Sequence, residues 1–283
     1  MSRYHLAGRT VLITGSTGGL GTALAKSLRE KGANLALLDL DQQLVEQQAA
    51  SLGPESVARG WTANVRDLDS LQRASDAAAE HFGRIDVVIA GAGVGAMAPL
   101  ERIDPAAWDR IIDINLNGVW RTFRANLPHV KATKGYLLAV SSMAAFVHSP
   151  LNGPYVASKA GVWALCDATR LELKHYGIGV GSVHPTFFRT PMMDDVRADP
   201  AGVTLWGGNK GGLWKMIPLD TVVNSITSGI ERRSKLIVPT WTNALAARIP
   251  GLIRPVIDRI GFPGDIIPKA IAQSSEAGWI NQR

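Results

Sequence analysis

The sequence has very little of three features that would place it in a specialised class of protein. It holds a single cysteine, Cys166, which excludes a framework of disulfide bonds and is typical of a reducing compartment. Its longest apolar run, from Val87 to Leu100, is broken by glycine and proline and is too short to cross a bilayer. The N-terminus contains no apolar core typical of a signal peptide. We therefore expect a cytoplasmic protein, at most peripheral to a membrane.

Nucleic-acid and metal-binding patterns are also missing. The net charge is +6, yet no block of lysine and arginine with interleaved aromatic residues occurs, so nucleic acid is not an expected partner. The six histidines show no spacing typical of metal ligands, so no metal site is expected. Positive charge gathers between Glu231 and Ile260, where six basic and two acidic residues give a net charge of +4.

Short apolar runs alternate with helical patterns along the chain. The runs predict strands at 10–14, 34–39, 56–64, 85–90, up to 142, 178–184 and 236–239, and the patterns predict helices at 19–31, 42–52, 68–82, 108–130 and 155–176. Such alternation is typical of a doubly wound α/β Rossmann fold, here with about seven parallel strands and helices on both faces. We expect one domain over 1–283, in which 10–190 form the cofactor and catalytic core, 191–215 a substrate loop, and 240–283 a C-terminal lid or interface extension.

The first predicted strand runs into a glycine-rich segment, T-G-S-T-G-G-L-G at 14–21, and a predicted helix follows. A tight glycine turn before a helix N-terminus favours the binding of a phosphate group. The glycines are spaced more widely than in G-x-G-x-x-G, and a flexible connection is the alternative. We expect a dinucleotide at this turn, held by Gly15, Ser16, Thr17, Gly19, Leu20 and Gly21.

Asp39 closes the second predicted strand, 18 positions beyond Gly21. A carboxylate at this place accepts hydrogen bonds from ribose hydroxyls and repels a 2′-phosphate. No basic residue directly follows Asp39, so NAD is the expected cofactor rather than NADP. A strand-end cap is the other interpretation of Asp39, and it is compatible with the same role.

Tyr155 and Lys159 stand four residues apart, just after Pro154, a residue that suits the first turn of a helix. The two side chains therefore share one helix face, and the Lys159 ammonium can lower the pKa of the Tyr155 phenol toward neutrality. This pair fits an acid/base device, with Ser142 placed to hydrogen-bond the reacting oxygen. Alone, Y-x-x-x-K is a weak signal, since such pairs occur by chance on solvated helix faces.

Taken together, these motifs resemble the short-chain dehydrogenase/reductase family, in its short single-domain branch, over about residues 10–190. A-G-A-G at 90–93 is similar to the family's N-N-A-G segment, and Asn115 in I-N-L-N-G matches its helix asparagine. Ser142 lies 13 positions before Tyr155, which is the family interval, and P-T-F-F-R-T at 185–190 is similar to the family's P-G-x-x-x-T.

The resemblance implies NAD-dependent interconversion of a secondary alcohol and a ketone. Its catalytic residues would be Asn115, Ser142, Tyr155 and Lys159. Tyr155 would be the acid/base, Lys159 would lower its pKa and bind the nicotinamide ribose, Ser142 would hold the substrate oxygen, and Asn115 would support a proton path through water. The residues implied in NAD binding, besides the glycine turn and Asp39, are Asn64, Val65, Ala90, Gly91, Ala92, Tyr155, Lys159, Pro185, Phe188 and Thr190.

The sequence departs from the family pattern in three segments. Ala90 and Gly91 replace both asparagines of N-N-A-G, so the hydrogen bonds that brace this turn must come from elsewhere. Asn64 stands where the family usually has an aspartate that contacts adenine. Thr186 replaces a glycine at the entry to the expected substrate lid.

His148, Thr186 and Trp206 are the candidates for contact with substrate. The apolar segment 241–260 carries regularly placed arginines, which fits a lid or subunit-contact helix, with a weak membrane-surface contact as the alternative. Apolar surface near the place where the substrate is expected to enter predicts a bulky hydrophobic substrate that is steroid-, terpene- or lipid-like. The family commonly associates through its long helices, which implies a homodimer or homotetramer.

A regulatory or scaffold protein that binds NAD with little turnover is the alternative function for the same fold. Such a protein has less need of the four catalytic residues. All four are present, which argues against this alternative.

Overall fold

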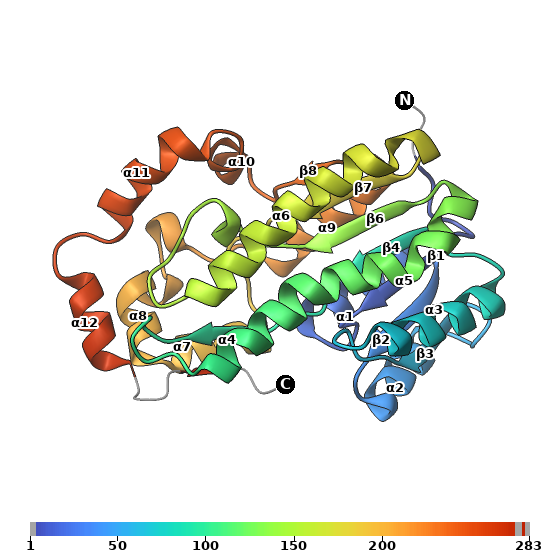
Figure 1. Cartoon of the computed structure of the whole chain (residues 1–283), viewed down its shortest axis with the longest axis horizontal. Helices are drawn as coiled ribbons and strands as arrows, with labels where there is room; N and C mark the ends of the chain where they lie inside the picture. The colour runs from blue at the N-terminus through green and yellow to red at the C-terminus, as the bar shows by residue number, and fades with distance from the viewer. Residues whose placement is uncertain (1–3, 275–278, 281–283) are drawn as a thin grey trace.

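The computed structural model describes residues 4–274 and the backbone of 279–280, and within these residues a seven-stranded parallel sheet runs through the centre (Figure 1). The strands are β1 (Thr10–Thr14), β2 (Asn34–Asp39), β3 (Ala58–Thr62), β4 (Val87–Ala90), β6 (Tyr136–Val140), β7 (Gly179–Val183) and β8 (Leu236–Ile237). They lie in the order β3-β2-β1-β4-β6-β7-β8, so the strand order reverses between β1 and β4. The doubly wound α/β Rossmann fold predicted from the sequence is confirmed, and ligands of such sheets bind where the order reverses, at the carboxyl ends of the strands.

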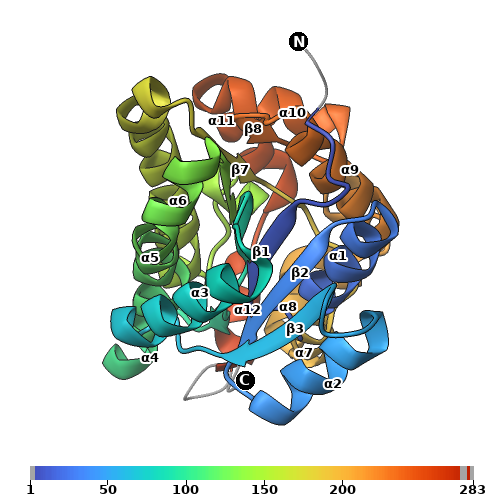
Figure 2. The same ribbon diagram turned by 90° about the vertical axis from the view of Figure 1, so that its right-hand side faces the viewer.

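Helices cover both faces of this sheet (Figure 2). One face is covered by α1 (Gly19–Glu30), α2 (Gln42–Leu52) and α9 (Leu219–Glu231), and the other by α3 (Leu68–Phe82), α5 (Gly118–Thr133) and α6 (Gly153–Leu173). Alternation along β1 sends Val11 and Ile13 to the first face and Leu12 to the second. Because both faces are covered, every residue of β1 is buried, which explains its continuous apolar pattern.

The helix predicted over 108–130 is present, with an irregular turn inside it. It begins earlier, as α4 (Pro105–Ile112), after the N-cap Asp104, and passes through a π-helical turn over Asp113–Asn117 before α5 begins. The π-helical turn was not predicted. A π turn inserts one extra residue without changing the apolar spacing on either side, so hydrophobic periodicity does not reveal it.

The segment predicted as a substrate loop, 191–215, contains α7 (Pro191–Ala198), α8 (Pro200–Trp206) and two short 3₁₀ turns. The C-terminal segment forms α10 (Trp241–Arg248), α11 (Pro250–Gly261), α12 (Ile266–Gln273) and β9 (Trp279–Ile280), which pairs antiparallel with β5 (Ala96–Met97). Residues 275–278 and 281–283 of the predicted extension lie outside the described residues. Among the described helices, none has the length and apolar character needed to cross a membrane.

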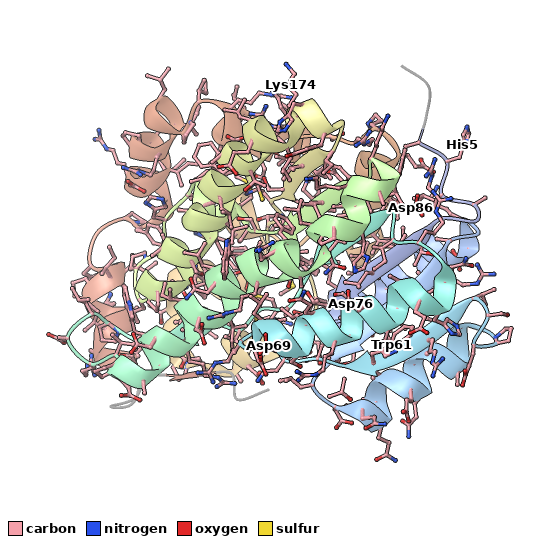
Figure 3. The ribbon with its side chains drawn as sticks, turned by 45° about the vertical axis from the view of Figure 1, so that its right-hand side comes forward. His5, Trp61, Asp69, Asp76, Asp86 and Lys174 are labelled. Atoms are coloured by element: carbon pink, nitrogen blue, oxygen red, sulfur yellow. The ribbon has the colours of Figure 1, made fainter. Side chains whose placement is uncertain are left out.

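Asp86 fixes the amino end of the sheet, away from the carboxyl ends of the strands. Its buried carboxylate accepts a hydrogen bond from the Thr10 N–H at 3.0 Å and pairs with Arg9 at 2.7 Å and Arg84 at 2.6 Å. Figure 3 places Asp86 close to the N-terminal His5. The two cations offset the cost of burying this charge, so β1 and β4 are held together at the end opposite the candidate site.

Candidate active site

The glycine turn between β1 and α1 needs glycine at two places for steric reasons. Gly15 has a φ of +68°, and a Cβ there would lie 2.7 Å from Cα of Ala92. A Cβ on Gly21 would lie 2.6 Å from the carbonyl oxygen of Ser16. Both distances are far inside van der Waals contact, so the turn can approach the A-G-A-G segment, and fold on itself, only with these glycines.

This turn has the features of an anion cradle. The Ser16 hydroxyl is buried and has no hydrogen-bond partner within the part of the chain that the structure describes. A buried polar atom without a partner is rare in proteins and here lies at the N-terminus of α1, where backbone N–H groups are also free to bind. A Cβ on Gly19 would lie 3.2 Å from Pro191 and 3.3 Å from Thr190, so the predicted carboxamide segment borders the turn, while Leu20 packs against the core. The residues present therefore fit a dinucleotide.

Asp39 lies directly beside the glycine turn. Its Oδ2 accepts hydrogen bonds from the Thr17 N–H at 2.9 Å and the Thr17 hydroxyl at 2.7 Å, and its Oδ1 accepts one from the Leu40 N–H at 2.8 Å. The carboxylate thus braces the turn and the strand end together. It places a negative charge at the position where the sequence predicted contact with a ribose.

Asn64 and Val65 lie in the loop that follows β3. The Asn64 side-chain oxygen accepts a hydrogen bond from the Arg66 N–H at 3.0 Å and so stabilises the loop. Val65 packs closely over α5, since a Cβ on Gly118 would lie 3.1 Å from it. Both residues lie just beyond the carboxyl end of β3, and their predicted contact with the cofactor stays a prediction.

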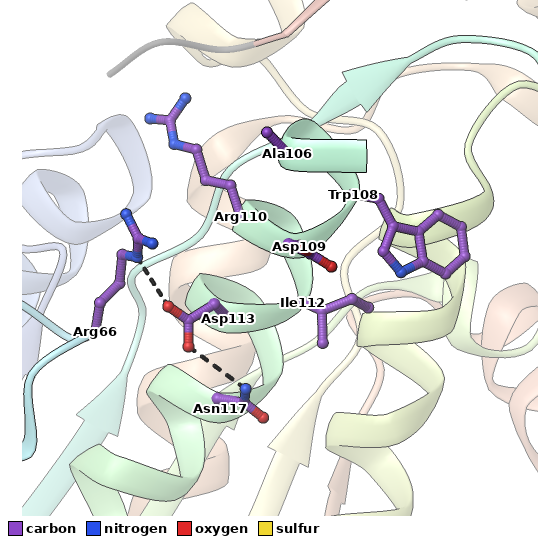
Figure 4. Close-up of a pocket in the computed structure, with 8 residues that line it drawn as sticks. All are labelled: Arg66, Ala106, Trp108, Asp109, Arg110, Ile112, Asp113 and Asn117. Carbon is purple, nitrogen blue, oxygen red and sulfur yellow. Dashed lines mark hydrogen bonds and ion pairs between the residues drawn. The ribbon is translucent and has the colours of Figure 1, made fainter. Parts of the chain in front are cut away.

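Asp113 ties this loop to the π-helical turn (Figure 4). Its carboxylate pairs with Arg66 at 2.8 Å and with Arg121 at 2.8 Å, and Asn117 donates a hydrogen bond to it at 3.4 Å. Partial burial alone would raise the pKa of Asp113, but the hydrogen bonds from the two arginines outweigh this and hold it below its usual range. The loop after β3 and the helix that carries Asn115 are therefore fixed to each other.

The turn after β4 has a brace that replaces the missing asparagines. The Gly91 N–H donates a hydrogen bond to the Thr14 hydroxyl at 3.2 Å, and a Cβ on Gly91 would lie 2.8 Å from the Thr14 carbonyl oxygen. Ala90 pairs with Thr14 in the sheet register. The hydrogen bond expected to come from elsewhere thus comes from the end of β1.

Ala92 and Gly93 connect the glycine turn to the predicted catalytic residues. Ala92 is the residue that Gly15 approaches. A Cβ on Gly93 would lie 3.3 Å from Oδ1 of Asn115 and 3.5 Å from Nζ of Lys159. Two adjacent residues thus contact both halves of the site, and both need small side chains.

Asn115 is fully buried in the π-helical turn and makes three hydrogen bonds. Its Oδ1 accepts from the Val94 N–H at 2.8 Å, and its Nδ2 donates to the Val94 carbonyl at 2.9 Å and to the Ser158 hydroxyl at 3.2 Å. The Ser158 hydroxyl donates in turn to the Tyr155 carbonyl at 2.8 Å. Asn115 therefore joins the segment after β4 to the first turn of α6.

Ser142, Tyr155 and Lys159 converge at the carboxyl end of β6. The Ser142 side chain is hydrogen-bonded to the Tyr155 phenol. Nζ of Lys159 lies 5.5 Å from the centre of the Tyr155 ring and donates a hydrogen bond to the Val140 carbonyl at 2.9 Å. The Ser141 hydroxyl donates to the Lys159 carbonyl at 2.8 Å, which fixes β6 against α6.

The pKa of Tyr155 is shifted in the direction opposite to the sequence prediction. Part of this residue reaches the surface, yet burial of its phenol raises the pKa above its usual value, and the Ser142 hydrogen bond opposes this only in part. Burial also lowers the pKa of Lys159, to about 8. Removal from water disfavours the charged form of both groups, a cost that the spacing of the two residues does not reveal.

His184 and Pro185 position the Ser142 segment. Nδ1 of His184 lies 3.1 Å from the Ser142 carbonyl oxygen, its Nε2 lies 2.8 Å from the Ser182 hydroxyl, and the Met143 N–H donates to the Pro185 carbonyl at 2.9 Å. Burial lowers the pKa of His184 to about 4. The sequence prediction did not single out this histidine, although its position directly before the P-T-F-F-R-T segment was an available signal.

The three predicted substrate residues lie on three segments of the chain, after β6, after β7 and in α8. His148 lies in a surface hollow, 3.2 Å from Arg254, and burial together with that cation lowers its pKa. Trp206 is buried in an apolar cluster, its ring 5.3 Å from that of Phe187, and its indole N–H has no partner among the described residues. Thr186, adjacent to Phe187, is half-buried.

The end of the P-T-F-F-R-T segment is held at both sides. Phe188 forms an isolated bridge with Ile217 and packs against the core beneath α1. The Thr190 hydroxyl caps α7 by accepting a hydrogen bond from the Met193 N–H at 3.3 Å. Thr190 also lies beside Gly19, so the segment borders the glycine turn.

Comparison with known proteins agrees with this arrangement. A family model described as short chain dehydrogenase matches residues 9–201. The chain is 34% identical over 218 residues to D-threitol dehydrogenase of Mycolicibacterium smegmatis, covering 76% of this chain and 80% of that protein. It is 34% identical over 209 residues to (-)-trans-carveol dehydrogenase of Rhodococcus erythropolis, covering 68% of this chain and 75% of that protein.

Solved structures share the fold. A short-chain dehydrogenase/reductase from Burkholderia phymatum, in complex with NAD, superposes with a TM-score of 0.78 at 23% identity, covering 89% of this chain and 96% of that one. The family model spans most of the chain, including the glycine turn and the residues around Tyr155. The protein belongs to the short-chain dehydrogenase/reductase family of oxidoreductases.

Proposed function

We propose that the protein interconverts a secondary alcohol and a ketone, with NAD as the hydride carrier. The observation that carries this proposal is the convergence of Ser142, Tyr155 and Lys159 beside the Ala92–Gly93 segment, which also borders the glycine turn. A reacting carbon bound here would lie between a proton donor and the dinucleotide site.

Each catalytic side chain has a role that its surroundings support. Ser142 donates a hydrogen bond to the substrate oxygen, and Tyr155 exchanges a proton with that oxygen. Because burial raises the pKa of Tyr155, the neutral phenol is favoured, which suits proton donation to a ketone. Oxidation requires the phenolate, which the nearby Lys159 ammonium stabilises. NAD held at the glycine turn would supply the hydride acceptor for oxidation and, in its reduced form, the hydride donor for reduction of the ketone.

The preference for NAD rests on Asp39. The three hydrogen bonds that it accepts from Thr17 and Leu40 hold its carboxylate beside the glycine turn. A 2′-phosphate at this position would meet a fixed negative charge, whereas ribose hydroxyls can donate hydrogen bonds to it. A relative of 33% identity from Mycobacterium tuberculosis is described as an NAD-dependent oxidoreductase, which supports the same preference.

We also propose a bulky, mainly apolar substrate. The segments after β4 and before α6 pack with α7 and α8 through a cluster of apolar residues, namely Met97, Leu151, Val196, Leu205 and Trp206. One relative is named for carveol and another for D-threitol, so the relatives alone do not decide between apolar and polar alcohols. The apolar cluster favours an apolar alcohol as the substrate.

Association of subunits through the long helices, as a homodimer or homotetramer, is a further part of the proposal. Trp120 on α5 and Leu171 on α6 are 48% and 66% exposed. Large apolar side chains on neighbouring helices suit burial between copies of the chain. A cytoplasmic location also fits, since the only cysteine, Cys166, is a free thiol.

The test is cofactor reduction measured by absorbance with NAD and with NADP, across secondary alcohols from short polyols to steroids. We expect turnover with NAD, a faster oxidation as pH rises, and the best rates with large apolar alcohols. Tyr155→Phe should abolish turnover while NAD binding, followed by calorimetry, persists. Tyr176→Phe, at an exposed tyrosine outside the site, is the matched control.

Substantial residual activity in Tyr155→Phe would refute the role of this residue. Turnover confined to small polyols would refute the apolar substrate, and a preference for NADP would refute the interpretation of Asp39. NAD binding without turnover on any alcohol or ketone would favour the regulatory alternative.

A further inference from the structure

The helices α10 and α11 carry a row of large apolar side chains that face solvent. They lie along the margin of the molecule, away from the central sheet (Figure 1). We call this row the outer face, and it consists of Trp241, Leu245, Leu252, Val256 and Ile260, whose exposed fractions are 84%, 51%, 74%, 57% and 58%. Single exposed apolar residues are common, but five on two consecutive helices form a patch of the kind that binds another surface.

The spacing shows that these side chains share one side of each helix. Leu252, Val256 and Ile260 follow one another at intervals of four, and so do Trp241 and Leu245. Residues four apart lie on the same helix face, so each set forms one stripe.

A neighbouring side of α11, about 80° around the helix from the outer face, attaches it to the protein. Ile253 and Ile257 pack against a cluster that includes Phe146, and Ala246 and Ala247 of α10 belong to the same cluster. Of the twelve residues of α11, all of them described, only Gly261 is buried. The outer face therefore adds nothing to the packing of the domain, and its apolar residues remain available to another surface.

Positive charge borders this face. With about 100° per residue, Arg248 lies roughly 20° from Trp241 around α10, and Arg259 roughly 20° from Leu252 around α11. Arg254 is taken up by the His148 hollow, and Asp258 lines the same hollow rather than the outer face. The wider segment from Glu231 to Ile260 has a net charge of +4. Apolar stripes flanked by arginine are typical of helices that lie on a membrane surface.

We propose that the outer face binds the surface of bilayers that contain anionic phospholipid. The twelve residues of α11 extend about 18 Å, well short of the ~30 Å hydrocarbon layer, so the helix lies in the interface and does not span it. The apolar stripe enters the boundary between headgroups and acyl chains, and Arg248 and Arg259 contact the anionic headgroups. A second copy of the chain on this face would place the arginines of both copies in one interface without added negative charge, which disfavours a self-complementary contact.

The test is co-sedimentation of the full-length protein with vesicles of phosphatidylcholine alone and of phosphatidylcholine with phosphatidylserine. We expect binding to the anionic vesicles that weakens with added salt, since the arginine contribution is screened. Leu252→Ser with Val256→Ser should lower the partition coefficient by about a hundredfold, at roughly tenfold for each lost apolar side chain. Arg248→Gln with Arg259→Gln should lower it by roughly 25-fold on anionic vesicles and little on neutral ones.

The matched control is Leu100→Ser, which changes a leucine of comparable exposure, 85%, outside these helices. This variant should bind as the wild type does, and circular dichroism should show that all variants melt alike. Equal binding by the wild type and the Leu252→Ser, Val256→Ser variant would overturn the proposal, as would no binding to anionic vesicles. A loss of oligomer mass in that variant, measured by light scattering, would assign the face to a second copy instead. None of these outcomes depends on the enzymatic activity.

Discussion

Replacement of Asn115 by alanine tests how the π-helical turn is held. The Asn115 amide satisfies both main-chain groups of Val94, accepting from its N–H at 2.8 Å and donating to its carbonyl at 2.9 Å. Alanine removes both partners at once, and Val94 is only 5% exposed, so water does not readily replace them. Asn117, two residues later in the same turn, is exposed and makes one long hydrogen bond of 3.4 Å. Asn117→Ala is therefore a control with the same chemical change.

The expected loss of stability follows from the two unsatisfied groups. A buried N–H or carbonyl without a partner costs about 1–3 kcal/mol, so Asn115→Ala should lower the free energy of unfolding by about 2–6 kcal/mol. Alanine's better helix propensity returns only about 0.5 kcal/mol of this. Asn117→Ala should remain within about 0.5 kcal/mol of the wild type, as surface substitutions do.

Urea unfolding followed by circular dichroism at neutral pH measures both variants. Asn115→Asp adds a second comparison, because its carboxylate can still accept from the Val94 N–H but cannot donate to the Val94 carbonyl. We expect Asn115→Asp to be destabilised as well. If Asn115→Ala and Asn117→Ala unfold at the same urea concentration, the amide does not brace the Val94 segment and the reasoning fails.

Two further predictions concern pH and the glycine turn. Because burial lowers the pKa of His184 to about 4, from about 6.5 when unfolded, the unfolded state takes up a proton first as pH falls. The free energy of unfolding should therefore fall by about 3 kcal/mol as pH drops from ~6.5 to ~4, and this effect of His184 is absent above pH ~6.5. His184→Gln should flatten the pH dependence of urea unfolding over that range, and an unchanged slope would contradict the assignment. Gly15→Ala should lose about 1–3 kcal/mol more than Gly8→Ala, since both have positive φ but only Gly15 has a neighbour, Ala92, within 4 Å. Equal melting temperatures of these two variants would contradict the close approach.

Much of the fold could be predicted because its signals are local. Strands such as β1 and β2 are buried on both faces, so they read as continuous apolar runs bounded by turn residues, and their predicted limits agree with the structure. The limits of α2 and α3 also agree, since Asp41 and Asp67 cap them by accepting hydrogen bonds from the following N–H groups. These preferences act within a few residues and need no knowledge of the rest of the chain.

The order of the motifs predicted the site for the same reason. Loops that follow parallel strands meet at one edge of the sheet, so Asp39, Ala90 and Ser142 had to come near the glycine turn. The sequence did not reveal what each side chain does there. Asp39 braces Thr17, and the Thr14 hydroxyl replaces the missing asparagines at Gly91. Such partners lie 22 and 77 positions apart, and no spacing rule connects them.

The sequence by itself thus determined the α/β class, the limits of β1 and β2, and the order of the motifs along the chain, because periodicity, caps and turn residues are local properties. Only the tertiary structure decided three other features. It placed an extra residue in the turn at Asn115, because the Val94 backbone needs that amide. It raised the pKa of Tyr155 by burial. It left the outer face of α10 and α11 uncovered, although α10 packs on the domain through Ala246 and Ala247 and α11 does so through Ile253 and Ile257. Burial depends on every segment that packs around a residue, and a linear pattern does not contain that information.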